Sequence, residues 1–194
     1  MSDQDSTAPP RKVLLFSGHM IDAPGRAQPR FPADKEALAA AAIAGALDRL
    51  GVGAADLAIC GGACGGDLLF AEAALERRAR LELYIPFEEP TFLAKSVDFA
   101  GRDWRRRYVA VRARAALHVM PVERGPTPEG EGSYERNNLW MLEAAMRFGA
   151  GKVDFLCLWN GQQADGPGGT RHLMDEVERR AGRSHWLDTR RLWS

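Results

Sequence analysis

Short apolar runs along the chain alternate with longer stretches in which apolar residues recur at helical spacing. The runs are rich in Val, Ile, Leu and Phe, and several are apolar throughout, which is typical of strands covered by helices on both faces. They occupy residues 12–18, 55–62, 81–87, 117–122 and 153–161. Residues 184–193 follow a strand pattern with His185, Leu187 and Thr189 on one face, which predicts a final edge strand.

Helical patterns separate these runs and cover residues 34–50, 67–80, 102–115, 134–148 and 170–181. Strands and helices that alternate this regularly, with right-handed crossovers, predict a sheet between two layers of helices. We therefore expect an α/β, doubly wound, three-layer Rossmann-like fold with a mostly parallel sheet of five or six strands. In such sheets the ligand lies beyond the carboxyl ends of the strands, where the strand order reverses.

The start of the chain differs from the rest. Residues 1–10 lack apolar periodicity and end in Pro9 and Pro10, which predicts a disordered N-terminal tail. With 194 residues in total, the remaining segment, 11–194, has the length of a single domain.

Composition and charge exclude several classes of function. The chain has 26 Lys plus Arg and 26 Asp plus Glu, so no overall field attracts a polyanion, and we expect no DNA or RNA partner. No apolar run reaches the roughly 18 residues that span a bilayer, so we expect no membrane contact and a cytoplasmic location. Cys60, Cys64 and Cys157 form no zinc-type CxxC pair, which predicts free thiols and neither a metal nor a cofactor.

The most informative segment is CGGACGGD at residues 60–67, which leads directly into a helix. Its four glycines, Gly61, Gly62, Gly65 and Gly66, allow close approach of a ligand, and amides at a helix start attract anions. The segment lacks the Lys-Ser/Thr ending of a P-loop and the spacing GxGxxG, so neither an ATPase nor a standard dinucleotide dehydrogenase follows. Asp67 is either a helix cap or a ligand of a ribose hydroxyl.

Polar residues also follow the other predicted strands. They are Ser17, Gly18 and His19 after the first strand, Asn137 and Asn138 one turn after Tyr134, and Asn160 after the fifth strand. The loop after the first strand also contains Arg26 and Arg30. Hydroxyl, imidazole and amide groups at these positions would hydrogen-bond to a ligand, although asparagine also favours helix caps.

A second glycine turn precedes the last long helix. In DGPGGTRH, residues 165–172, Gly168 and Gly169 lead into Thr170, which is a natural N-cap. Two glycine-to-helix junctions on one edge of a sheet favour the binding of phosphate at that edge.

Together, the segments CGGACGGDLLFAEAAL and GPGGTRHLMDEV resemble the SLOG superfamily. This Rossmann-like group includes the LOG cytokinin-activating phosphoribohydrolases, DNA-processing DprA proteins and sensor domains of bacterial conflict systems. The resemblance covers the chain from Val13 onward and implies binding of a nucleotide or nucleotide derivative. Some members release a base from a nucleoside monophosphate.

The second segment departs from the LOG pattern PGGxGTxxE. Here the glycines run straight into Thr170, two residues short, and Leu173 stands where the catalytic glutamate is expected. The arginine-lysine motif of those enzymes is also missing. The resemblance therefore assigns a phosphate cradle to Gly168, Gly169 and Thr170 but assigns no catalytic residue.

Three functions remain open. The first is a sensor module that binds a nucleoside phosphate or an ADP-ribose-like small molecule, as a monomer or a homo-oligomer. The second is a phosphoribohydrolase, whose chemistry needs a carboxylate such as Asp67, Glu135 or Asp165. The third is a scaffold domain, which would show an exposed apolar patch and no well-formed cleft.

Overall fold

The computed structural model describes residues 8–125, 132–162, 170–180 and 182–194. Its six strands form one sheet in the order β4-β3-β2-β1-β5-β6, and every neighbouring pair is parallel. The strands are β1 Val13–Gly18, β2 Leu57–Cys60, β3 Arg80–Ile85, β4 Ala116–Val119, β5 Val153–Trp159 and β6 Arg183–Asp188. The predicted Rossmann-like fold class is confirmed.

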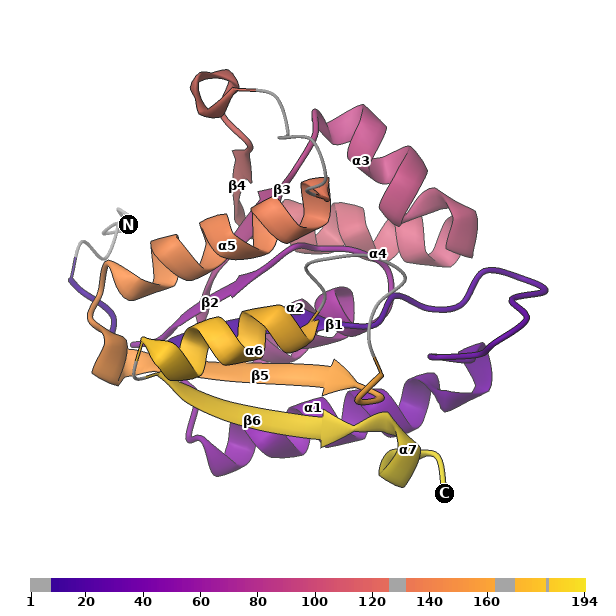
Figure 1. The fold of residues 1–194 in the computed structure, drawn as a ribbon, viewed down its shortest axis with the longest axis horizontal. Helices are drawn as coiled ribbons and strands as arrows, with labels where there is room; N and C mark the ends of the chain where they lie inside the picture. The colour runs from indigo at the N-terminus through magenta and orange to yellow at the C-terminus, as the bar shows by residue number, and fades with distance from the viewer. Residues whose placement is uncertain (1–7, 126–131, 163–169, 181) are drawn as a thin grey trace, which may run out of the picture.

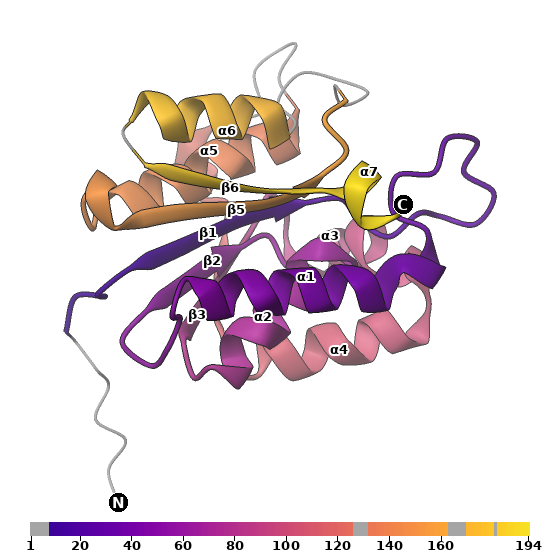
Figure 2. The same ribbon diagram turned by 90° about the horizontal axis from the view of Figure 1, so that it is seen from below.

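Helices cover both faces of this sheet, which gives three layers (Figure 2). On one face lie α1 (Glu36–Arg49), α2 (Gly66–Glu76) and α4 (Arg102–Arg112), and on the other lie α5 (Ser133–Met146) and α6 (Thr170–Arg179). Two shorter helices, α3 (Glu89–Ser96) and α7 (Thr189–Leu192), lie at the ends of the layers. Figure 1 shows α5 and α6 side by side above the strands.

The central strand β1 contributes alternate side chains to two hydrophobic cores. Leu14 and Phe16 belong to the core beneath α1, α2 and α4, whereas Val13 and Leu15 belong to the core beneath α5 and α6. All four side chains are fully buried. Because successive residues of a strand point to opposite faces, an entirely apolar run is what a strand between two helix layers requires.

Two predicted elements differ from those observed, and one observed helix was not predicted. The helix predicted at 67–80 ends at Glu76, and Arg78 takes a left-handed backbone with φ 64°. The predicted edge strand 184–193 ends at Asp188, whose side chain accepts a hydrogen bond from the Arg190 amide and so caps α7. Helix α3 was not predicted, because Phe92 and Leu93 are the only buried large apolar residues in its sequence.

Most of the predicted tail at 1–10 lies outside the described residues, and only 8–10 are described. Among the residues that the structure describes, no helix is both long and apolar enough to cross a bilayer. The same residues contain no cluster of three or more His, Cys, Asp or Glu side chains suited to a metal ion.

Candidate functional site

The sheet order places a switch point between β1 and β5. The chain moves from β1 through β2 and β3 to β4 on one side, then crosses to β5 on the other side of β1. The carboxyl ends of β1 and β5 therefore border a crevice, as doubly wound sheets do at their switch points. A cavity of about 250 Å³ lies there, and we call it the inner cleft.

Six of the predicted site residues line the inner cleft. They are Ser17, Gly18, His19, Asp67, Asn138 and Thr170. They come from the end of β1, from the first turns of α2 and α6, and from the second turn of α5. The hydroxyl oxygens of Ser17 and Thr170 lie 3.5 Å apart, so β1 and α6 meet at this point.

The glycine-rich loop before α2 reaches the inner cleft through Ala63 and Asp67, while its four glycines lie behind them. The Asp67 carboxylate accepts a hydrogen bond of 3.3 Å from the Ala63 amide, and the amides of Gly61 and Gly62 favour its ionised form and so act to lower its pKa. A Cβ atom on Gly61 would lie 2.8 Å from Asp67 Oδ2. These loop amides are thus directed at a carboxylate within the protein.

The second half of the same loop packs backbone to backbone against the segment that follows β1. Gly65 forms an antiparallel bridge with Met20, and the Gly66 amide donates to the His19 carbonyl at 3.0 Å. Gly65 has φ +98°, and a Cβ atom there would lie 2.5 Å from the Ile21 nitrogen. Position 65 therefore requires glycine, because the two chain segments approach too closely for a side chain.

Asp67 is the carboxyl group at the floor of the inner cleft. Burial raises its pKa to about 7, although the amides of Ala63, Gly61 and Gly62 act in the opposite direction. Near neutral pH the group is thus partly protonated. In that form it donates a hydrogen bond and does not repel a phosphate, which removes the conflict between an aspartate and an anion site.

His19 forms the wall of the inner cleft at the end of β1. Burial lowers its pKa to about 4, and the nearby charge of Arg30 acts in the same direction. The His19 Nε2 atom accepts a hydrogen bond of 3.2 Å from the Asn160 amide. The imidazole is therefore neutral at physiological pH, and the positive charge of the cleft comes from Arg30, which also lines it.

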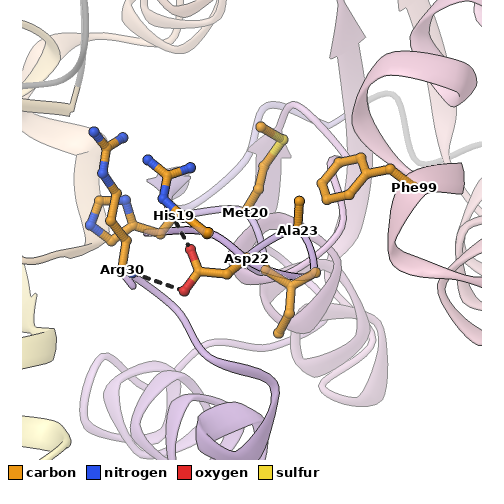
Figure 3. A pocket seen from close by; sticks show the side chains of 8 residues that line it. His19, Met20, Asp22, Ala23, Arg30 and Phe99 are labelled. Carbon is orange, nitrogen blue, oxygen red and sulfur yellow. Dashed lines mark hydrogen bonds and ion pairs between the residues drawn. The ribbon is translucent and has the colours of Figure 1, made fainter. Parts of the chain in front are cut away.

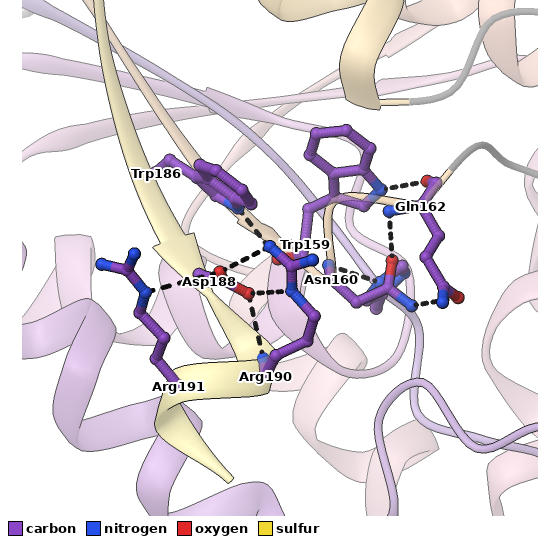
Figure 4. A network of polar contacts seen from close by, with 8 residues as sticks. Trp159, Asn160, Gln162, Trp186, Asp188, Arg190 and Arg191 are labelled. Carbon is purple, nitrogen blue, oxygen red and sulfur yellow. Dashed lines mark hydrogen bonds and ion pairs between the residues drawn. The ribbon is translucent and has the colours of Figure 1, made fainter. Parts of the chain in front are cut away.

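Asn160 is buried outside the cavity, in the polar network of Figure 4. Its side chain exchanges two hydrogen bonds with Gln162, at 3.1 and 3.2 Å, and Trp159 Nε1 donates to the Gln162 carbonyl. Trp186 Nε1 then donates to the Trp159 carbonyl from β6. Asn160 is thus a positioning residue that fixes the turn after β5 and, through its amide, His19.

The two predicted asparagines of α5 point in different directions. Asn138 lines the inner cleft, whereas Asn137 is 3% exposed and donates from Nδ2 to the Tyr84 carbonyl at 2.7 Å. Asn137 thereby ties α5 to the end of β3. Neighbouring helix positions are about 100° apart around the axis, so one residue packs while the other faces the cavity.

Tyr134 lines the inner cleft and contacts Ser96, a buried residue that sequence reasoning missed. The Tyr134 hydroxyl lies 2.7 Å from Ser96 Oγ, and the Cys64 amide donates to the Ser96 carbonyl at 2.8 Å. Ser96 therefore joins the glycine loop to the tyrosine at the cleft entrance. It ends α3, the helix that the sequence pattern did not predict.

A second cavity, of about 270 Å³, lies directly beside the first, and we call it the outer cleft (Figure 3). Its walls include Asp22, Arg26 and Phe99, together with Arg30. The carboxylate of Asp22 accepts hydrogen bonds from the amides of Arg30 and Phe31, both at 2.9 Å. The only sequence signal for this cavity was the pair of arginines in the loop after β1.

Some predicted site residues lie outside the described residues. These are Gly168 and Gly169 of the second glycine turn, and Asp165 before them. Thr170 is described and is the first residue of α6. Of that turn, the structure therefore places only Thr170 in the inner cleft.

A scaffold domain was expected to show an exposed apolar patch and no cleft. In the part of the chain that the structure describes, the exposed large apolar residues are Met20, Leu38, Val109, Val122, Tyr134 and Trp186. They are distributed over separate elements, and two of them, Met20 and Tyr134, line the inner cleft. This distribution favours a ligand-binding protein over a scaffold.

No family model matches the sequence, and no curated protein does. A search of solved structures finds DNA processing protein A from Helicobacter pylori, whose structure was reported for its single-stranded DNA binding mode. The two chains are 15% identical, with a TM-score of 0.35 over 94% of this chain and 79% of that chain. These values carry no conclusion about function. The prediction that excluded DNA and RNA as partners is withdrawn, since the solved structure found is that of a single-stranded DNA-binding protein.

Proposed function

We propose that the protein binds a nucleotide or nucleotide derivative in the inner cleft, as a sensor module of the SLOG type. The observation that carries the proposal is the set of groups around one cavity at the switch point of the sheet. Three hydroxyls, one carboxyl, one amide, one imidazole and the guanidinium of Arg30 line it. Sites of this kind combine apolar walls with a few convergent polar groups.

In this proposal, different residues of the inner cleft bind the phosphate, the ribose and the base of a nucleotide. Arg30 and the hydroxyls of Ser17 and Thr170 bind the phosphate, with the positive end of α6 behind Thr170. Asp67 and Asn138 are placed to hydrogen-bond to ribose hydroxyls. The ring of Tyr134, together with Met20 and Met141, supplies apolar surface for the base.

A thermal-shift panel tests this proposal. The panel contains AMP, ADP, ADP-ribose, inorganic phosphate and a short single-stranded DNA. A ligand at a hundred times its dissociation constant is expected to stabilise the protein by about 2.7 kcal/mol, or roughly 5–10 °C for a chain of this length. If no nucleotide shifts the melting temperature, the proposal is contradicted. A shift with DNA alone would show that the ligand is a nucleic acid and not a small molecule.

A matched pair of variants locates the binding. Thr170→Val removes one hydroxyl from the inner cleft at almost constant volume, and we expect a loss of affinity of about tenfold or more. Thr91→Val removes an exposed hydroxyl on α3, outside the residues that line the cleft, and should leave the affinity unchanged. Equal affinities for the two variants would place the ligand elsewhere.

A second candidate function is the hydrolysis of an N-glycosidic bond in a nucleoside monophosphate. The observation that favours it is Asp67, a carboxyl group in the inner cleft whose pKa of about 7 suits a general acid or base. Glu135 lies instead beside His172, at 3.9 Å, and does not line the inner cleft.

Product analysis separates this enzyme from the sensor. After overnight incubation with AMP, hydrolysis would yield adenine and ribose 5-phosphate, and Asp67→Asn would abolish both products while retaining binding. Tight binding of AMP without either product supports the sensor.

A further inference from the structure

The inner and outer clefts share three wall residues, His19, Met20 and Arg30. They are thus two lobes on either side of one short segment after β1. Each cavity alone, at about 250 and about 270 Å³, is slightly smaller than the roughly 300 Å³ at which sites for larger organic ligands begin. Taken together, the two lobes fall within that range.

One of the three shared wall residues, Met20, has a flexible side chain on a fixed backbone. The bridge between Met20 and Gly65 holds the backbone, while the side chain is 39% exposed. A methionine thioether adopts many conformations at little cost and adapts to a ligand that contacts it. A molecule that occupies both lobes would therefore displace the Met20 side chain at little cost.

The outer cleft has two chemically different ends. Figure 3 shows the side chain of Arg30 at one end and Phe99 at the other, with Met20 and Ala23 between them. Arg26 lines the same cavity, and its Nε lies 3.5 Å from Asp22. The lobe thus offers a cationic group, Arg30, where it adjoins the inner cleft and an aromatic ring at its far end.

We propose that a single ligand with two nucleotide-like units joined by a diphosphate occupies both lobes. This inference rests on the proposed function of the inner cleft. The first unit lies in the inner cleft, the diphosphate passes Arg30, which lines both lobes, and the second unit contacts Phe99. Arginine suits this position because its guanidinium forms paired hydrogen bonds with phosphate oxygens. The ligand class is a dinucleotide or a nucleotide sugar, rather than a nucleoside monophosphate.

Calorimetric titration with AMP, ADP-ribose and the dinucleotide pTpT, whose two phosphates are not joined to each other, tests the inference. For the unaltered protein we expect ADP-ribose to bind at least tenfold more tightly than AMP. We also expect ADP-ribose to bind more tightly than pTpT, because pTpT lacks the diphosphate. Tighter binding of pTpT would overturn the inference in favour of a single-stranded nucleic acid.

Variants of the outer cleft identify the second lobe. Arg26→Gln is expected to lower the affinity for ADP-ribose about tenfold and that for AMP less than twofold, since Arg26 lines the outer cleft alone. Phe99→Leu should have the same selective effect by removing the ring. Arg106→Gln is the control, because Arg106 is 81% exposed on α4, and it should change neither affinity.

The outcomes separate this inference from the function on which it rests. Equal affinities for AMP and ADP-ribose, with no effect of Arg26→Gln or Phe99→Leu, overturn the two-lobe ligand and leave the inner-cleft proposal standing. Failure of both nucleotides to bind the unaltered protein overturns the proposed function itself. A thermal melt of each variant separates loss of binding from loss of folding.

Discussion

Two side chains of the inner cleft, Asp67 and His19, have pKa values shifted in opposite directions. The two shifts have opposite effects on how stability changes with pH. The raised pKa of Asp67, about 7, means that the folded protein holds a proton that the unfolded chain releases near pH 4. The lowered pKa of His19, about 4, means that the folded protein lacks a proton that the unfolded chain holds up to about pH 6.5. Between about pH 4 and 6.5, rising pH thus lowers stability through Asp67 and raises it through His19.

Substitution of Asp67 by asparagine separates these two contributions. Asp67→Asn removes the cost of ionising a buried carboxyl, so we expect it to be more stable than the unaltered protein by about 2–4 kcal/mol at pH 8. The gain should vanish near pH 4, where the carboxyl is protonated in the folded protein. Urea unfolding across this pH range measures the difference.

Asp103→Asn is the control for this measurement, because Asp103 is 60% exposed on α4. It should have little effect at any pH. A gain for Asp67→Asn that is constant from pH 4 to pH 8 would contradict a raised pKa for Asp67.

At the scale of elements, the inner cleft depends on the contact between residues 19–21 after β1 and residues 64–66 before α2. The Ile21 amide donates to the Cys64 carbonyl at 3.2 Å, and the Gly66 amide donates to the His19 carbonyl. This contact sets the distance between His19 and Asp67, which both line the cavity. The main role of the glycine-rich loop is therefore packing, and this packing determines the shape of the cleft.

Gly65→Ala tests the packing role. Its positive φ and the 2.5 Å approach of the Ile21 nitrogen leave no room for a Cβ atom, so we expect a loss of about 2–4 kcal/mol in the free energy of unfolding. Gly53→Ala is the matched control, because a Cβ there would meet nothing within 4 Å. It should change stability by about 0.5 kcal/mol or less. Similar losses for the two variants would show that the contact does not constrain Gly65.

At the scale of the whole molecule, one sheet serves two cores. Leu14 and Leu15 are neighbours on β1, yet they pack into the cores on opposite faces. At the β6 edge, the buried Asp154 of β5 pairs with Arg183 and His185 of β6, which lowers the pKa of Asp154 against the effect of burial. Because the strands are common to both cores, neither helix layer has a complete core without the sheet.

We therefore predict that the chain unfolds as one domain. Leu14→Ala and Leu15→Ala should each lower the free energy of unfolding by about 2–5 kcal/mol, as large-to-small changes in cores do. In both variants, far-UV circular dichroism and tryptophan fluorescence should follow a single, coincident transition. Trp104 reports on one core and Trp140 on the other. Two separate transitions in either variant would indicate two independent units.

The sequence by itself determined the fold class and the edge of the sheet at which the cleft lies. Strands buried on both faces must be apolar throughout, and the helices between them must repeat at 3.6 residues, so both patterns are local properties of the chain. Ser17, Asn138 and Thr170 were also predictable as polar residues that follow strands or begin helices.

Only the tertiary structure decided what these residues contact. The sequence indicated close approach at Gly65, but the partner, the backbone of Ile21, lies more than forty residues earlier in the chain. Asn137 and Asn138 differ in role because of their positions around a helix axis. Arg30 and Phe99 line one cavity although one comes from a loop and the other from a single 3-10 turn, neither with a periodic pattern. The pKa of Asp67 likewise depends on the burial produced by all its neighbours together, which no local stretch of sequence contains.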